Sequence, residues 1–348
     1  MFSEQLLTVS GQSINVAAGP VNGTPFLILH GIPSRWQGMY PLMASLEARW
    51  HVLACDLRGH GKSGRAASYR AVDYSSDIAA MLEQNVDAPA VLLGHSGGAM
   101  AALGAAGLVP QLVRAVVLLD PPFAQRDGSN WPNSTSDFLL GVSDILLRRR
   151  EVGDVLKQLF PDITTAQIEW FRETFSCIDK RVIDVLLEGR YFEELDLGGS
   201  LRRVTCPTLM LYGEVERGGL VRESDIAFFL GHARRAKVEQ IKGSGHFLHA
   251  EQPQLILEIA ERWLADVVTF LMLFTLASGG VRRAQAWQRG EVKHRVRTTP
   301  IAQAAATQIA LPMKSRPTKA RVPSWRQRIE PAAYGTGSLR RQLPVSAM

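Results

Sequence analysis

A serine in a glycine-rich turn is the first residue whose surroundings suggest chemistry. The apolar run 91–93 ends in the motif Gly-His-Ser-Gly-Gly at 94–98, and small residues follow. This pattern predicts a strand, a strained turn and a helix, with Ser96 in the turn. Gly94 and Gly98 have no Cβ and leave room for it. We expect Ser96 to be a nucleophile at the positive N-terminus of the helix, rather than a turn serine without a function.

A serine hydroxyl needs a base that accepts its proton, so the histidines come next. His246 lies in a glycine-rich loop between the last expected strand and the last expected helix. Such a loop can place an imidazole over the serine, and we expect His246 to be the base rather than an exposed loop residue. Three more histidines follow expected strands. We interpret His30 as shaping its loop, His60 as a turn residue, and His95 as pointing away from the serine.

The imidazole in turn needs a carboxylate that fixes its tautomer and stabilises its charged form. Glu216 lies three residues after the glycine that ends the penultimate expected strand, which gives the chain order serine, acid, histidine. Asp120 ends the strand that follows the serine helix, and Glu214 is closer to the end of its own strand. We expect Glu216 to be the acid, with Asp120 as the alternative and Glu214 among the remaining candidates. Otherwise, the glutamates would be solvated loop charges.

The negative oxygen that forms on attack needs fixed hydrogen-bond donors. The backbone N–H groups of Gly97, after the serine, and of Ile32, after His30-Gly31, are the candidates. Pro33 has no N–H and cannot donate.

Nucleotide and metal sites are not expected. Gly61-Lys62-Ser63 imitates the end of a phosphate-binding loop, but the glycine that this motif requires is replaced by Asp56. The chain has three cysteines, an odd number without paired spacing, which predicts neither a disulfide framework nor a zinc site. We therefore expect no metal and no cofactor.

The elements that must position these residues alternate between buried strands and helices, which predicts an α/β fold with a mainly parallel sheet. The ligand site of such a sheet lies beyond the carboxyl ends of its strands, where the candidates above fall. From 123 to 200 no strand-like run occurs, and apolar residues at helical spacing predict a helical insertion. Thr164 and Gln167 are suited to a capping box within it. A last helix is expected from about Pro253 to Leu264.

The amino-acid composition predicts a folded body and a tail that differs from it in charge. The chain has 348 residues, of which 46% are hydrophobic and 21% charged, enough for one large domain with insertions or for two domains. Residues 281–348 hold 14 basic and two acidic residues, a charge of +12 within a total of +6, so the body carries −6. The high basicity therefore says nothing of nucleic-acid binding by the body.

The tail, 267–348, begins with the apolar run 267–277, which is too short to span a bilayer, and continues as a basic segment. Its composition predicts disorder. Its charge could attract nucleic acid or anionic lipid, but we favour a dispensable extension, such as one from an altered reading frame or stop codon. The first residues lack the features of a signal peptide, so a cytoplasmic location is expected.

Taken together, four motifs over about residues 3–266 make the chain resemble the α/β-hydrolase superfamily. They are His30-Gly31-Ile32-Pro33, the loop 56–63, the serine turn 94–98, and Gly245-His246 with Glu251 and Pro253 downstream. The resemblance implies an eight-stranded, mostly parallel sheet flanked by helices, with core segments 1–122 and 201–266 and a helical cap at 123–200 inserted after strand six. The tail at 267–348, expected from composition, lies outside the resemblance. The resemblance also implies an acid after strand seven, where Glu216 replaces the usual aspartate.

The expected function is a metal-independent serine hydrolase that cleaves a small or medium carboxylic ester, thioester or lactone as its small-molecule substrate. The resemblance also admits a cofactor-free perhydrolase, a carbon–carbon bond hydrolase, and a small-molecule receptor or catalytically weak relative. Epoxide hydrolases and haloalkane dehalogenases of the superfamily use an aspartate nucleophile, so Ser96 argues against both. Carbon–carbon bond hydrolases usually have tryptophan after the histidine, where this chain has Phe247.

Overall fold

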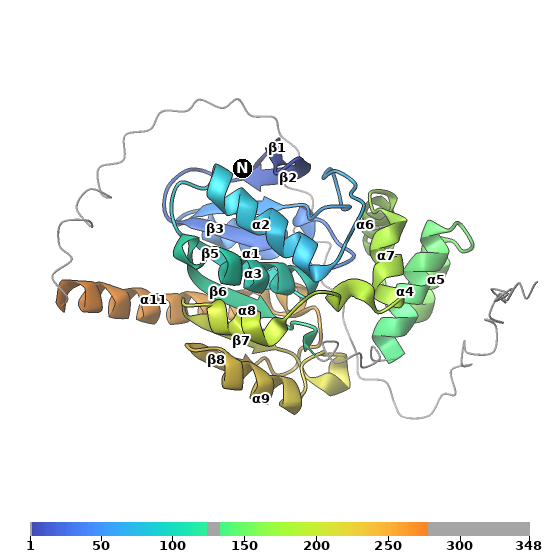
Figure 1. Ribbon diagram of the computed structural model, residues 1–348. Helices are drawn as coiled ribbons and strands as arrows, with labels where there is room; N and C mark the ends of the chain where they lie inside the picture. The colour runs from blue at the N-terminus through green and yellow to red at the C-terminus, as the bar shows by residue number, and fades with distance from the viewer. Residues whose placement is uncertain (1, 124–132, 278–348) are drawn as a thin grey trace, which may run out of the picture. The chain divides into compact units, whose positions relative to one another are not determined.

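The computed structural model describes residues 2–123 and 133–277. One eight-stranded sheet runs through them in the order β1-β2-β4-β3-β5-β6-β7-β8 (Figure 1). Strand β2 pairs antiparallel with both neighbours, and the pairs from β4 to β8 are parallel. The strands are β1 (Ser3–Val9), β2 (Gln12–Ala18), β3 (Pro25–Leu29), β4 (His51–Cys55), β5 (Ala90–His95), β6 (Val113–Leu119), β7 (Thr208–Tyr212) and β8 (Ala236–Gln240). The predicted eight-stranded, mostly parallel sheet is confirmed.

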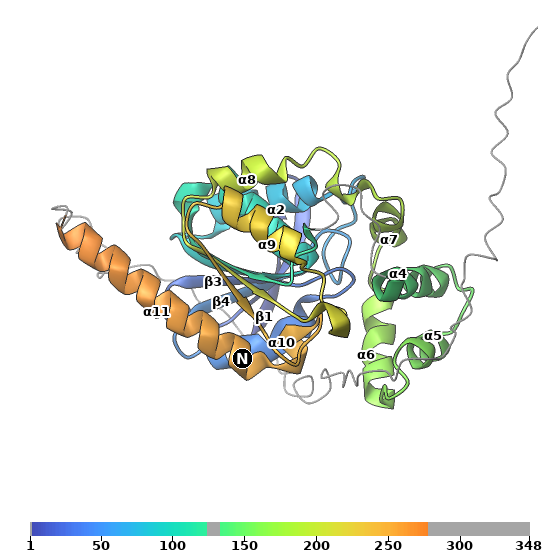
Figure 2. The same ribbon diagram turned by 90° about the horizontal axis from the view of Figure 1, so that it is seen from below.

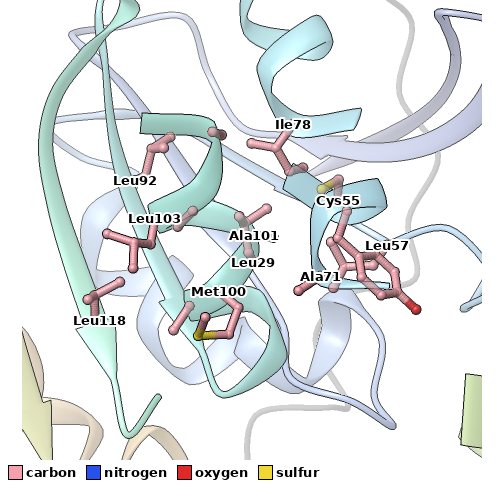
Figure 3. Packing of buried hydrophobic residues seen from close by; sticks show 14 of the residues in the cluster. Leu29, Cys55, Leu57, Ala71, Ile78, Leu92, Met100, Ala101, Leu103 and Leu118 are labelled. Atoms are coloured by element: carbon pink, nitrogen blue, oxygen red, sulfur yellow. The ribbon is translucent and has the colours of Figure 1, made fainter. Parts of the chain in front are cut away.

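The central strands are buried on both faces. Successive residues of β3 alternate between two apolar clusters, with Leu27 and Leu29 in one and Phe26 and Ile28 in the other. This alternation follows from the two-residue repeat of a strand, and it explains why the sequence reads as continuous apolar runs. Figure 3 shows one of these clusters, in which Leu29 packs with residues of neighbouring strands and helices.

Helices cover both faces of the sheet (Figures 1 and 2). One cluster includes apolar residues of α2 (Ala71–Asn85), α3 (Gly97–Leu108), α8 (Leu197–Arg203) and α9 (Glu223–His232), and it continues into the helices of the insertion. The other includes residues of α1 (Tyr40–Leu46), α10 (Leu248–Glu251) and α11 (Pro253–Ala277). Short 3-10 turns lie between these elements: η1 (Trp36–Met39), η2 (Pro110–Leu112) and η5 (Val215–Arg217).

Helix α3 is buried between its neighbours because its residues are small. A Cβ on Gly104 would lie 2.0 Å from Ser75 Oγ of α2, and one on Gly107 would lie 3.0 Å from the Ser200 carbonyl of α8. Such close approach requires glycine, so these positions hold the helix that follows Ser96 tightly against the core.

Helices alone fill the described part of the insertion, as predicted. They are α4 (Asn133–Leu146), α5 (Val152–Leu159), α6 (Thr165–Ser176) and α7 (Lys180–Leu187), followed by the turn η4 (Arg190–Phe192). The predicted capping box is confirmed, because Gln167 N donates to Thr164 Oγ1 at 3.2 Å and Thr164 N donates to Gln167 Oε1 at 2.9 Å. The expected end of the insertion at 200 falls inside α8, which packs on α3 of the core.

The last helix is longer than predicted. Helix α11 continues from Pro253 through the apolar run to Ala277, so the tail boundary expected at 267 falls inside it. The rest of the expected tail, 278–348, lies outside the described residues. Among the helices of the described segments, none has the length and hydropathy that a membrane span requires.

Candidate active site

The serine turn joins β5 to α3 with a strained backbone. Ser96 has φ 51° and ψ −117°, a conformation that costs free energy for any residue other than glycine. A Cβ on Gly94 would lie 2.2 Å from the Gly98 carbonyl, and one on Gly98 would lie 2.4 Å from the His30 carbonyl. Ser96 N donates to the Leu119 carbonyl at 2.9 Å, which ties the turn to the end of β6. The predicted strand, turn and helix are confirmed.

Asp120 follows directly at the end of β6 and pairs with the predicted base. His246 Nδ1 donates to Asp120 Oδ2 at 2.6 Å, and the Asp120 side chain is fully buried. Two backbone groups from the loop after β7 also donate to this carboxylate, Leu220 N to Oδ2 at 2.8 Å and Gly213 N to Oδ1 at 3.1 Å. A buried carboxylate with three donors is stabilised as an anion, the state that an imidazolium partner needs.

The expectation that Glu216 would pair with His246 is wrong, and the alternative, Asp120, occupies that place. Glu216 lies exposed in η5. Glu214 accepts hydrogen bonds from Gly243 N at 3.0 Å and from Arg217 Nε at 2.9 Å, which lower the pKa of its carboxyl group and shape the loop. The loop after β7 therefore supplies backbone donors to the carboxylate that pairs with His246, and not that carboxylate itself.

The backbone of His246 is fixed by a hydrogen bond from His95. His95 Nε2 donates to the His246 carbonyl at 2.8 Å, and the two ring centroids are 4.6 Å apart. Burial, together with the neighbouring His249 and His246, holds the pKa of His95 well below its usual range, so this ring is neutral. No signal in the sequence indicates this role, because only the folded chain brings the end of β5 and the His246 loop together.

The loop after β3 packs directly on the serine turn. A Cβ on Gly31 would lie 3.2 Å from Ser96 Cβ. Atoms of the Ile32 side chain would lie 2.9 and 3.0 Å from a Cβ on Gly97. The two residues whose N–H groups are the candidate oxyanion donors are therefore neighbours beside the serine, an arrangement suited to stabilising a negative oxygen.

His30 and His60 have the loop-shaping roles expected of them. His30 Nδ1 donates to the Gly31 carbonyl at 2.8 Å, and its Nε2 accepts from Leu57 N at 3.0 Å, which joins the loops after β3 and β4. His60 Nδ1 donates to the Arg58 carbonyl at 2.9 Å within its own turn. Burial lowers the pKa of His30 to about 4 and that of His60 to about 3, so both rings are neutral at neutral pH.

The loop that imitates a phosphate-binding motif is filled by an acidic side chain. Asp56 Oδ2 accepts from Lys62 N at 3.0 Å, and a Cβ on Gly61 would lie 2.2 Å from the same oxygen. A phosphate would meet a carboxylate at this point, so the loop is unsuited to nucleotides. Over the described ranges, no group of three or more histidine, cysteine, aspartate and glutamate side chains could hold a metal ion.

Known proteins with a similar sequence and fold are hydrolases. Residues 26–259 match the model of the Alpha/beta hydrolase family. The chain is 28% identical over 260 residues to 2-(acetamidomethylene)succinate hydrolase of Mesorhizobium japonicum, which covers 68% of this chain and 86% of the relative. It is also 28% identical over 256 residues to pimeloyl-[acyl-carrier protein] methyl ester esterase of Xanthomonas oryzae pv. oryzae, covering 71% and 97%.

The solved structures agree on the fold. The crystal structure of naproxen esterase from Bacillus subtilis has a TM-score of 0.62 at 20% identity, and the match covers 76% of this chain and 92% of that chain. The crystal structure of E-2-(acetamidomethylene)succinate hydrolase has a TM-score of 0.60 at 24% identity, covering 76% and 100%. At such identities the likeness shows the fold and leaves the reaction to be argued from the site.

Proposed function

Because the chain belongs to the alpha/beta hydrolase family, we propose that it is a serine hydrolase that cleaves a small or medium carboxylic ester, thioester or lactone through an acyl-enzyme on Ser96. The observation that carries this proposal is the 2.6 Å hydrogen bond from His246 Nδ1 to the buried Asp120 carboxylate, beside the strained Ser96 turn. A histidine whose Nδ1 proton is held in this way keeps the lone pair of Nε2 free to accept a proton.

In the first half of the proposed reaction, His246 Nε2 takes the proton of Ser96 Oγ while Oγ attacks the carbonyl carbon of the substrate. The carbonyl electrons move onto oxygen, and the N–H groups of Ile32 and Gly97 stabilise the resulting anion. When the carbonyl re-forms, the bond to the leaving oxygen or sulfur breaks. The leaving group takes the proton from His246, and the acyl group remains esterified to Ser96.

In the second half, His246 removes a proton from water, and the hydroxide attacks the acyl carbon. The same donors stabilise the second tetrahedral anion. Its collapse breaks the bond to Ser96 Oγ, which regains the proton from His246, and the carboxylic acid leaves. Asp120 stays ionised throughout and stabilises the imidazolium that forms twice in each turnover.

A fluorophosphonate probe tests the nucleophile. We expect covalent labelling of the wild-type protein and none of Ser96→Ala, with both variants folded by circular dichroism. A folded wild type that does not react would overturn the proposal and favour a small-molecule receptor on the same fold. A series of p-nitrophenyl esters from acetate to dodecanoate then defines the acyl chain that is accepted.

A second substrate class follows from the comparisons. The Mesorhizobium relative is named for hydrolysis of 2-(acetamidomethylene)succinate, which carries an N-acyl group. The proposed acyl-enzyme chemistry can serve an amide when the imidazolium of His246 protonates the nitrogen leaving group. Assaying this compound beside the ester series distinguishes the two classes, since an amidase would cleave it with a higher kcat/KM than any of the esters.

A further inference from the structure

A tyrosine that the proposed mechanism does not use reaches the serine turn from outside the sheet. Tyr191 lies in η4, on the segment that leads from α7 of the insertion back to α8. Its hydroxyl donates a hydrogen bond to the Gly97 carbonyl at 3.2 Å, across 94 positions of the sequence. The side chain is 2% exposed, and burial raises the pKa of the phenol, so it stays protonated and able to donate.

The contact falls where the backbone most needs support. Helix α3 begins with Gly97 and Gly98, and glycine has the widest conformational freedom of any residue. Gly98 is confined by backbone, because a Cβ there would lie 2.4 Å from the His30 carbonyl. The nearest atoms to a Cβ on Gly97 are instead side-chain atoms, the two of Ile32 and the Tyr191 hydroxyl at 3.3 Å.

The N–H of Gly97 lies in the peptide that joins it to Ser96, and its carbonyl lies in the peptide that joins it to Gly98. The two planes meet at the Gly97 Cα, so a bond that holds the carbonyl limits the backbone rotation that would turn the N–H. We infer that Tyr191 is a positioning residue that limits the backbone rotation of Gly97 so that its N–H points at the developing oxyanion, and that the insertion acts on the reaction through this contact. The inference rests on the proposed function. Since an oxyanion donor gains strength only as charge develops, its misalignment affects the transition state and leaves substrate binding intact.

The neighbouring Tyr74 offers a matched control. Its ring packs against that of Tyr191 with centroids 6.2 Å apart, and it is fully buried in α2. Within the described parts of the chain, its hydroxyl has no hydrogen-bond partner. Tyr191→Phe and Tyr74→Phe therefore each remove one buried hydroxyl from the same cluster, and only the first removes the bond to Gly97.

The experiment measures kcat and KM of the wild type and of both variants on one p-nitrophenyl ester. The concentration of active sites is determined by titration with a fluorophosphonate, so that kcat is expressed per functional site and misfolded protein is not counted. The affinity of an alkyl boronic acid, which forms a tetrahedral adduct with a nucleophilic serine, is measured in parallel. For Tyr191→Phe we expect kcat to fall about five- to tenfold with KM unchanged, and the boronic acid to bind more weakly by the same factor. Tyr74→Phe should behave as wild type.

The outcomes separate the two proposals. A wild type that neither labels nor turns over overturns the proposed function, and this inference with it. An active wild type with an equal kcat per titrated site in Tyr191→Phe overturns the positioning role alone. So does a rise in KM without a change in kcat, or a loss shared equally by Tyr74→Phe, because either would indicate substrate contact or general packing.

Discussion

The loops after β6 and β7 leave neighbouring strands at the same edge of the sheet, and both carry carboxylates. The pairing of Leu119 with Leu211 places the two loop starts side by side. Asp120, at the start of the first loop, bonds to His246, whereas Glu216, three residues past Gly213 in the second, is exposed. A carboxylate on a loop beside the site therefore does not necessarily pair with His246.

The difference lies in what surrounds each carboxylate. Asp120 is fully buried and accepts from Gly213 N and Leu220 N as well as from His246. An unpaired carboxylate would be too costly to bury, and these backbone donors offset that cost. The loop after β6 thus supplies the carboxylate, and the loop after β7, on the neighbouring strand, supplies the backbone donors that hold it in place.

The largest predicted effect is that of Asp120→Asn. The amide keeps the shape of the side chain but removes the charge that stabilises the imidazolium, and it can donate to His246 Nδ1 and favour the wrong tautomer. We expect kcat on the best p-nitrophenyl ester to fall by about 10³- to 10⁴-fold. The control is the melting temperature, which shows whether the variant is folded. Near wild-type activity in a folded Asp120→Asn would show that Asp120 is not the acid that serves His246.

The sequence could predict much of this site because its signals are local. The apolar runs, the glycines around Ser96 and the loop of His246 each depend on a few adjacent residues. The acid could not be decided in this way, because the chain order serine, acid, histidine holds for Asp120 and Glu216 alike. What decides between them is the pair of donors at Gly213 and Leu220, which tertiary structure alone brings to Asp120.

Two further features were missed for different reasons. Tyr191 gives no signal, because a tyrosine in a linker between helices has no period or spacing that points to Gly97. The full length of α11, in contrast, was predictable from the sequence. No glycine or proline interrupts the chain between Pro253 and Ala277, so nothing local ends the helix at Leu264.

A smaller effect is expected when a backbone donor to Asp120 is displaced and Asp120 itself is kept. In Gly213→Ala, the new Cβ would lie 2.1 Å from the Gly245 carbonyl and 2.9 Å from the Ser244 carbonyl, so backbone must move apart. The shift displaces the donor to Asp120 and the loop of His246. We expect a loss of about 1–3 kcal/mol in the free energy of unfolding, measured by urea denaturation, and a kcat lower by about tenfold.

Gly231→Ala is the matched control for this change. Gly231 lies exposed in α9, and a Cβ there would meet no atom within 4 Å. Alanine favours a helix over glycine by up to about 1 kcal/mol, so this variant should be equally or more stable and fully active. Equal behaviour of the two variants would show that the loop after β7 tolerates displacement and does not hold the acid.

The smallest effect predicted is for Glu216→Gln, which tests the other side of the comparison. The residue is exposed in η5, and glutamine keeps its length and its ability to accept hydrogen bonds while removing the charge. Because Asp120 already occupies His246 Nδ1, we expect kcat/KM to stay within about twofold of wild type, as is usual for exposed positions away from the reacting groups. The measurement is the full pH profile of kcat/KM on the same ester, since an acid that acted on His246 would shift its acidic limb. A fall of a hundredfold, or a displaced limb, would mean that the loop after β7 exchanges its carboxylate with Asp120 during the reaction and that the two loops share the role.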